Sequence, residues 1–96
     1  MQVTLLPTAR EDLREIWLFG AERWGDTRAD VYFFELSEAI EGIGLSPLMN
    51  ARAEELAEPY RRLFHDAHTV IYRVEADAVV VVRVLHQRRD MGRWVE

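Results

Sequence analysis

Apolar and polar residues follow two different periods along this chain, and the change of period marks its elements. Residues Gln2 to Leu6 alternate with period two, which places Val3 and Leu5 on one side, and Pro7 ends the run. The pattern predicts a short β-strand that is added to a sheet formed by later strands.

The next segment has the period of a helix. Thr8 is followed three residues later by Glu11, a capping-box pattern that predicts the start of a helix at Thr8. Gly25 suits a C-terminal cap, so the helix is expected to end near Trp24. The apolar positions at helical spacing are Leu13, Ile16, Trp17, Gly20 and Trp24. Trp17 and Trp24 are expected to anchor this helix against its neighbour.

A second helix is expected after Gly25, with Asp26 or Thr27 as its N-cap. Its apolar stripe consists of Ala29, Phe33, Leu36, Ile40 and Ile43. Its outer face carries Glu35, Glu38 and Glu41, and Gly42, Gly44 and Pro47 end the element. Because the connection between the helices is so short, they must run antiparallel.

Residues 48–59 show no period and are interpreted as a connection. Three β-rich runs follow it, separated by Asp66-Ala67 and Ala76-Asp77, and they predict an antiparallel meander. The runs are Tyr60 to His65, Thr69 to Glu75 and Val79 to His86. Val79 to Val82 is apolar on both faces, as in a central strand. Because the pattern does not determine the register, the relative facing of Arg73 and Arg83 stays open.

These elements predict an α+β fold, in which an N-terminal strand and an antiparallel helical hairpin pack with a small antiparallel β-sheet. The order is β-α-α-β-β-β, followed by a basic C-terminal tail over residues 87–96. A chain of 96 residues, of which 49% are hydrophobic, is long enough for one core and too short for two. We therefore expect a single domain over residues 1–96.

Charge is distributed unevenly over the chain, whose net charge is −5. Residues 1–59 hold 5 Arg and 12 Asp or Glu, whereas residues 60–96 hold 7 Arg and 5 Asp or Glu. The chain contains no Lys, and a guanidinium does not act as a general base near neutral pH. An acidic front and a basic back indicate association with a partner.

The composition also narrows the compartment and the chemistry. The chain has no Cys, which fits a reducing cytosol, and no run approaches the roughly 18 apolar residues of a membrane span. We expect a cytoplasmic protein that does not enter a membrane. No spacing typical of metal ligands is present, so neither a metal nor a cofactor is expected.

The order of elements, together with the segments AREDLREIWLFGAERWG, RRL and HTVIYRVEADAVVVVRVLHQRRD, resembles the ParE branch of the RelE/ParE superfamily of bacterial toxin-antitoxin systems. The resemblance covers nearly the whole chain and is sharpest from HTVIYRV to VVRVLHQRRD. It implies a small toxin, of the kind linked to plasmid stabilisation, that is neutralised by a ParD-like antitoxin encoded beside it. The target that it implies is DNA gyrase, whereas the RelE branch cuts messenger RNA in the ribosome.

Ribosome-dependent RNA cleavage is the alternative function. RelE-type enzymes use basic sheet residues and a C-terminal tyrosine; Arg61 falls near a basic sheet position and Arg88 near an arginine after the last long strand. Histidine exchanges protons near pH 7, so His65, His68 and His86 keep this alternative open, and its candidate catalytic residues are Arg61, His68, His86 and Arg88. His68 stands where an arginine is expected, and Trp94 approaches the tyrosine position. An indole N–H donates a hydrogen bond but does not act as a useful acid or base. We therefore assign no catalytic residue and expect a gyrase inhibitor, not an enzyme.

The resemblance and the charge pattern both indicate the end of the last strand and the tail after it as the surface that binds the target. The candidate target-binding residues are His86, Arg88, Arg89, Arg93 and Trp94. Direct DNA binding by a chain of net charge −5 is disfavoured, so DNA is expected to be contacted only through the antitoxin. A non-toxic module that only binds an antitoxin is the third alternative.

Overall fold

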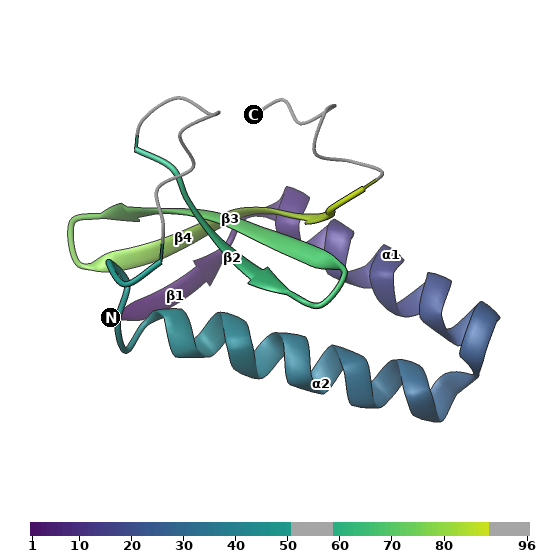
Figure 1. The fold of residues 1–96 in the computed structure, drawn as a ribbon. Coiled ribbons are helices and arrows are strands. Elements are labelled where there is room, and N and C mark those ends of the chain that lie inside the picture. Colours follow the sequence, from purple (N-terminus) through teal and green to yellow (C-terminus); the bar gives the residue numbers. More distant parts are fainter. Residues whose placement is uncertain (51–58, 89–96) are drawn as a thin grey trace.

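A computed structural model describes residues 1–50 and 59–88 of the chain. Figure 1 shows the elements in the predicted β-α-α-β-β-β order. They are β1 (Gln2–Leu5), α1 (Pro7–Trp24), α2 (Asp26–Ile43), β2 (Arg61–His65), β3 (His68–Glu75) and β4 (Ala78–His86). The element order is thus confirmed, and the tail beyond residue 88 lies outside the described residues.

The sheet has the strand order β1-β4-β3-β2, so β3 and β4 are central, as the apolar run Val79 to Val82 predicts. β2, β3 and β4 form the expected antiparallel meander. β1, however, pairs parallel to β4, with Val3 opposite Val79. The sheet is therefore mixed. β1 runs parallel to β4, whereas β3 runs antiparallel to both β2 and β4.

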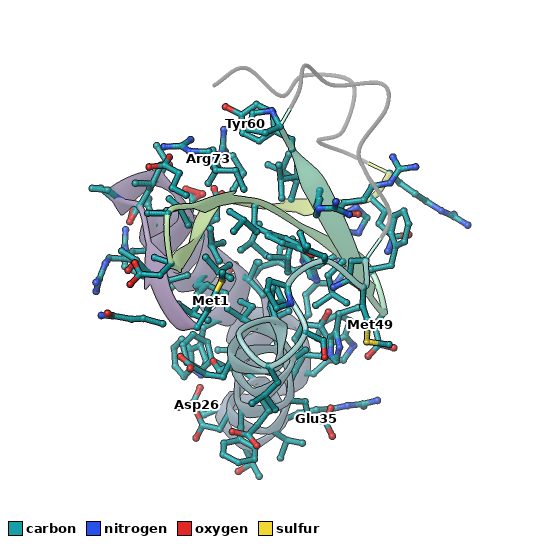
Figure 2. The ribbon with its side chains drawn as sticks, turned by 90° about the vertical axis from the view of Figure 1, so that its left-hand side faces the viewer. Met1, Asp26, Glu35, Met49, Tyr60 and Arg73 are labelled. Atoms are coloured by element: carbon teal, nitrogen blue, oxygen red, sulfur yellow. The ribbon has the colours of Figure 1, made fainter. Side chains whose placement is uncertain are left out.

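Two apolar clusters cover the two faces of the sheet. The main core lies between the sheet and the two helices, below the sheet in Figure 2. Its buried members are Ala9, Leu13, Leu36, Ile40, Ile43, Val70, Tyr72, Val79, Val81 and Val84. The second cluster consists of Tyr60, Ile71, Val82 and Leu85. Tyr60 lies above the sheet, away from the helices, so β3 and β4 are apolar on both sides.

The first helix begins differently from the capping-box prediction. Pro7 is its first residue, and Leu6 is an N-cap without a side-chain hydrogen bond. The Thr8 hydroxyl donates to the Val82 carbonyl oxygen of β4 at 2.8 Å, and Glu11 pairs with Arg14. The capping box is therefore wrong, because a tertiary acceptor on β4 competes for the Thr8 side chain.

This acceptor exists because β4 is longer than β1. β1 ends at Leu5, opposite Val81, and beyond that point the outer edge of β4 has no partner strand. The turn into α1 takes over this edge. The Leu6 N–H donates to the Val81 oxygen at 3.0 Å, and the Val84 N–H donates to Asp12 Oδ2 at 2.9 Å. Together with the Thr8 bond, these contacts fasten α1 along the sheet edge.

Asp12 also forms a two-pronged pair with Arg83. Arg83 Nε lies 2.8 Å from Asp12 Oδ2, and Arg83 Nη2 lies 3.0 Å from Asp12 Oδ1. Arg73 instead pairs with Glu75 and points away from the helices, as Figure 2 shows. The two arginines that interrupt the strands therefore have different partners. Arg83 pairs with Ile71 and Arg73 pairs with Val80, so the register shift between Ile71 and Tyr72 lies between the two arginines along the β3-β4 hairpin.

The helical hairpin turns on a single residue, Gly25, whose φ of 91° favours glycine. Gly25 is also the N-cap of α2, and no side chain caps this helix, so the expected caps Asp26 and Thr27 are wrong. Trp17 anchors the hairpin as predicted, because its Nε1–H donates to Asp30 of α2 at 2.7 Å. Trp24 is 56% exposed and does not anchor it.

Replacing Asp12 with Ala is expected to destabilise the domain by about 2 kcal/mol, because the Arg83 guanidinium and the Val84 N–H lose their common acceptor. Urea unfolding followed by circular dichroism measures the change. Glu11→Ala is the matched control, since it removes one carboxylate from the same helix, at an exposed pair with Arg14. Equal stabilities of the two variants would contradict the role of Asp12.

Candidate functional site

Three histidines meet at one end of the sheet because of the strand register. His65 pairs with His68 across β2 and β3, and His68 pairs with His86 across β3 and β4. The His68 and His86 rings meet edge to face, with centroids 5.6 Å apart. Residues that are far apart in the sequence thus form one cluster, with His68 only 9% exposed at its centre.

Tyr32 of α2 joins this histidine cluster to the helical layer. Its hydroxyl oxygen lies 2.7 Å from His68 Nδ1 and 3.4 Å from the His65 carbonyl oxygen. Burial raises the pKa of Tyr32 to about 12, with a further contribution from the negative charge of Asp66. Tyr32 is therefore neutral at physiological pH. Its hydroxyl connects α2 to the sheet.

The chain that leaves β4 is fastened to the same cluster. The Gln87 N–H donates to the Ala67 oxygen at 2.8 Å, and its side-chain amide donates to the Asp66 oxygen at 2.8 Å. The Arg88 N–H donates to His86 Nδ1 at 3.2 Å. These bonds place the exposed Arg88 beside the histidines. The other candidate contact residues, Arg89, Arg93 and Trp94, lie outside the described residues.

A groove of about 790 Å³ opens beside the cluster, between the tip of the helical hairpin and the end of the sheet. The apolar, aromatic and imidazole side chains in its lining include Ile16, Phe19, Trp24, Tyr32, His68 and His86. Phe19 and Trp24 are 39% and 56% exposed, and the Arg23 guanidinium lies over both rings. The groove is thus mostly apolar, and Glu15, Glu22 and Arg28 also contribute to its lining.

Of the residues expected in a nuclease, His68, His86 and Arg88 lie together, whereas Arg61 lies apart from them. Arg61 begins β2, whereas His65, the neighbour of His68, ends it, a separation of about 13 Å for four residues of strand. Arg61 donates to the carbonyl oxygens of Asn50 at 2.8 Å and Leu48 at 3.4 Å. It fixes the loop that follows α2 and does not face His68, His86 or Arg88.

Tyr32 and Phe19 are site residues that the sequence pattern did not reveal. Both lie one position away from residues of an expected apolar stripe, Phe33 for Tyr32 and Gly20 for Phe19. The helical period indicated the stripe but not its neighbours. They become part of a site only because the helical hairpin and the histidine cluster line the same groove.

Comparisons with known proteins agree with this architecture. The family model described as ParE toxin of type II toxin-antitoxin system, parDE, matches residues 3–91. Toxin ParE1 of Mycobacterium tuberculosis is 40% identical over 90 residues, which span 93% of this chain and 92% of that protein. Toxin ParE1 of Caulobacter vibrioides is 42% identical over 79 residues, which span 82% of this chain and 81% of that protein.

The fold itself has a counterpart among solved structures. A chain of the chromosomal ParDE TA system from P. aeruginosa superposes with a TM-score of 0.81 at 16% identity, covering 90% of this chain and 95% of that chain. Fold and relatives define a small toxin of a type II toxin-antitoxin system. The chain belongs to the ParE toxin family.

One further observation concerns membranes. None of the helices within residues 1–50 and 59–88 is both long enough and apolar enough to cross a bilayer.

Replacing Tyr32 with Phe is expected to change the alkaline stability of the domain. Between the ordinary tyrosine pKa of 10.0 and the folded value of about 12, the unfolded chain releases the Tyr32 proton while the folded chain keeps it. The free energy of unfolding therefore falls as pH rises through this window and is unaffected below it. Urea unfolding across the window should show a shallower fall for Tyr32→Phe. Identical slopes for the two chains would show that Tyr32 is not held in its neutral form.

Proposed function

We propose that this ParE-family toxin inhibits DNA gyrase by binding it in the cytoplasm, and that a ParD-like antitoxin neutralises the toxin by binding. The match of the ParE family model to residues 3–91 carries this proposal. The arrangement of the basic and imidazole side chains supports binding over bond breaking.

A nuclease needs a proton acceptor, a proton donor and cations around one phosphate. Arg61 contacts two carbonyl oxygens at the far end of β2 from the histidines. His68 is 9% exposed, and Tyr32 has a pKa of about 12. Arg61 is thus separated from the histidines and from Arg88, which supports a toxin that acts by binding.

The proposed contact with gyrase is the exit of β4, from His86 onward. His86 is only half-buried, and Arg88 is exposed and positioned by its bond to His86. Arg89, Arg93 and Trp94 continue this basic segment in the sequence. Guanidinium groups form paired bonds with carboxylates, so an acidic patch on the target protein is the complement that this segment fits.

The proposed contact with the antitoxin is the apolar groove between the helical tip and the histidine cluster. Phe19 and Trp24 expose aromatic surface to solvent in this groove. An amphipathic antitoxin segment that fills such a groove would bury these rings. Because His86 also lines the groove, the bound antitoxin would lie beside the proposed gyrase contact and would exclude gyrase from it.

Induction of the chain alone in a bacterial host is expected to stop DNA synthesis before protein synthesis. Pulse labelling of both in the first minutes makes the test. Replacing Arg88 and Arg89 together with Ala should weaken the DNA arrest at least about tenfold in toxin dose, since charge-assisted contacts to the target are lost.

The matched control is Arg10→Ala with Arg14→Ala, which removes the same charge from the exposed face of α1. It should leave the arrest unchanged. Earlier loss of protein synthesis would instead select the RNA-cleaving alternative, and harmless expression would select the non-toxic module.

Replacing Phe19 and Trp24 together with Ser is expected to weaken antitoxin binding by about 100-fold, because two aromatic anchors of the groove are removed. Both rings are partly exposed, so the fold should persist. Calorimetric titration with the cognate antitoxin measures the affinity. Val31→Ser with Phe34→Ser is the control, since these exposed side chains of α2 do not line the groove. An unchanged affinity of the groove variant would place the antitoxin elsewhere.

A further inference from the structure

The outer face of α2, on the side of the helix away from the core, carries two exposed apolar side chains. Phe34 is 65% exposed and Val31 is 52% exposed, whereas Leu36, on the opposite side of the same helix, is buried. Val31 and Phe34 are three residues apart, so their side chains are neighbours on the helix surface. Figure 2 shows Asp26 and Glu35 on opposite sides of α2.

Polar side chains continue this face toward both ends of α2. Thr27 precedes Val31 by four residues, and Glu38 follows Phe34 by four residues. This spacing places all four side chains in one row along the helix, and all four are exposed. We call Thr27, Val31, Phe34 and Glu38 the outer stripe.

Two opposite charges border the outer stripe on the same flank. Arg28 and Glu35 each come one residue after a member of the stripe, and they are seven residues apart, about 10 Å along the helix axis. Both side chains are exposed. Neither has an opposite charge three or four residues away on α2, the spacings at which a helix forms ion pairs. The helix itself therefore neutralises neither charge.

We propose that the outer stripe is the contact between two copies of this chain, in which two α2 helices pack antiparallel about a two-fold axis. The axis passes between Val31 and Phe34, so that Val31 of each copy packs on the partner's Phe34. The inference goes beyond the proposed function and is independent of the toxin's target.

Charge complementarity selects a second copy as the occupant of the stripe. A two-fold axis across two antiparallel helices brings the same flank of each helix together, with the direction reversed. Arg28 then lies opposite the partner's Glu35, offset by about 3 Å along the helix, and the symmetry forms this pair twice. Paired guanidinium and carboxylate groups thus border the apolar centre in both halves of the contact.

The ends of the stripe are complementary in the same arrangement. Glu38 lies opposite the partner's Thr27, in the first turn of α2. The helix dipole favours a negative charge there, and no side chain caps this helix. A parallel pair of helices would instead place Glu38 against the partner's Glu38 in the middle of the stripe, where like charges repel. The charges therefore favour antiparallel packing.

The contact is small, which predicts a weak dimer. α2 has 18 residues, or about 27 Å, and the outer stripe occupies only the part from Thr27 to Glu38. A single pair of helices with two apolar side chains per copy lies at the low end of protein interfaces, so a dissociation constant on the order of 10 µM is expected.

Sedimentation equilibrium of the purified chain over about 1 to 200 µM tests the dimer. Replacing Val31 and Phe34 together with Ser should weaken dimerisation at least about tenfold, because the apolar centre is lost from both copies. Both side chains are exposed, so the fold should persist, which circular dichroism checks. Leu48→Ser with Met49→Ser is the matched control, since it removes two exposed apolar side chains from the loop after α2, and should dimerise normally.

A charge exchange tests the antiparallel arrangement. Arg28→Glu alone and Glu35→Arg alone each place like charges opposite one another twice, so each should weaken dimerisation by about tenfold. The double variant forms both pairs with reversed signs and should dimerise within about threefold of the unsubstituted chain. Because the two positions are seven residues apart on one helix, such a recovery reports a contact between copies.

A chain that stays monomeric through this concentration range would overturn the inference, and so would normal dimerisation of the Val31 and Phe34 variant. A double charge variant that fails to recover would overturn the antiparallel contact. Calorimetric titration with the cognate antitoxin tests the other occupant. If the Val31 and Phe34 variant lost antitoxin affinity while its self-association stayed unchanged, the stripe would belong to the antitoxin and the inference would fall.

Discussion

The structure depends on the way in which α1 completes the edge of β4. β4 has 9 residues and β1 has 4, so the outer edge of β4 extends past its parallel partner. Backbone groups at such an edge must find acceptors or donors, and Thr8 and Asp12 supply them at Val82 and Val84. Asp12 at the same time accepts both prongs of Arg83. One helical turn therefore fixes the helix, the strand and the half-buried charge of Arg83 relative to one another.

The position of the hairpin determines where a site can form. With α1 fastened near its start and α2 joined to it by Trp17 and Asp30, the tip of the hairpin reaches the end of the sheet where the histidines lie. Tyr32 closes the contact between the layers at that end. What is left between the tip and the cluster is an apolar groove next to the exit of β4. The described part of the fold thus places an apolar groove beside the histidine cluster.

The two ends of the edge strand β2 carry different surfaces. The histidine end carries the concave groove lined by Phe19, Trp24 and Tyr32. The other end is an ordered loop with exposed apolar side chains beside Arg61.

The sequence by itself determined the elements, their order and the family, because hydrophobic periods of 3.6 and 2 depend only on which residues neighbour each other along the chain. It also identified Trp17 as a hairpin anchor, Gly25 as the turn, and Val79 to Val82 as a central strand. It did not determine the start of α1, the parallel pairing of β1, the exposure of Trp24 or the union of the three histidines with Tyr32. Most of these depend on strand register or on hydrogen bonds between residues far apart in the sequence, such as Thr8 with Val82 and Tyr32 with His68. Such contacts leave no local pattern in the sequence, because they form only when the helical layer packs against the sheet.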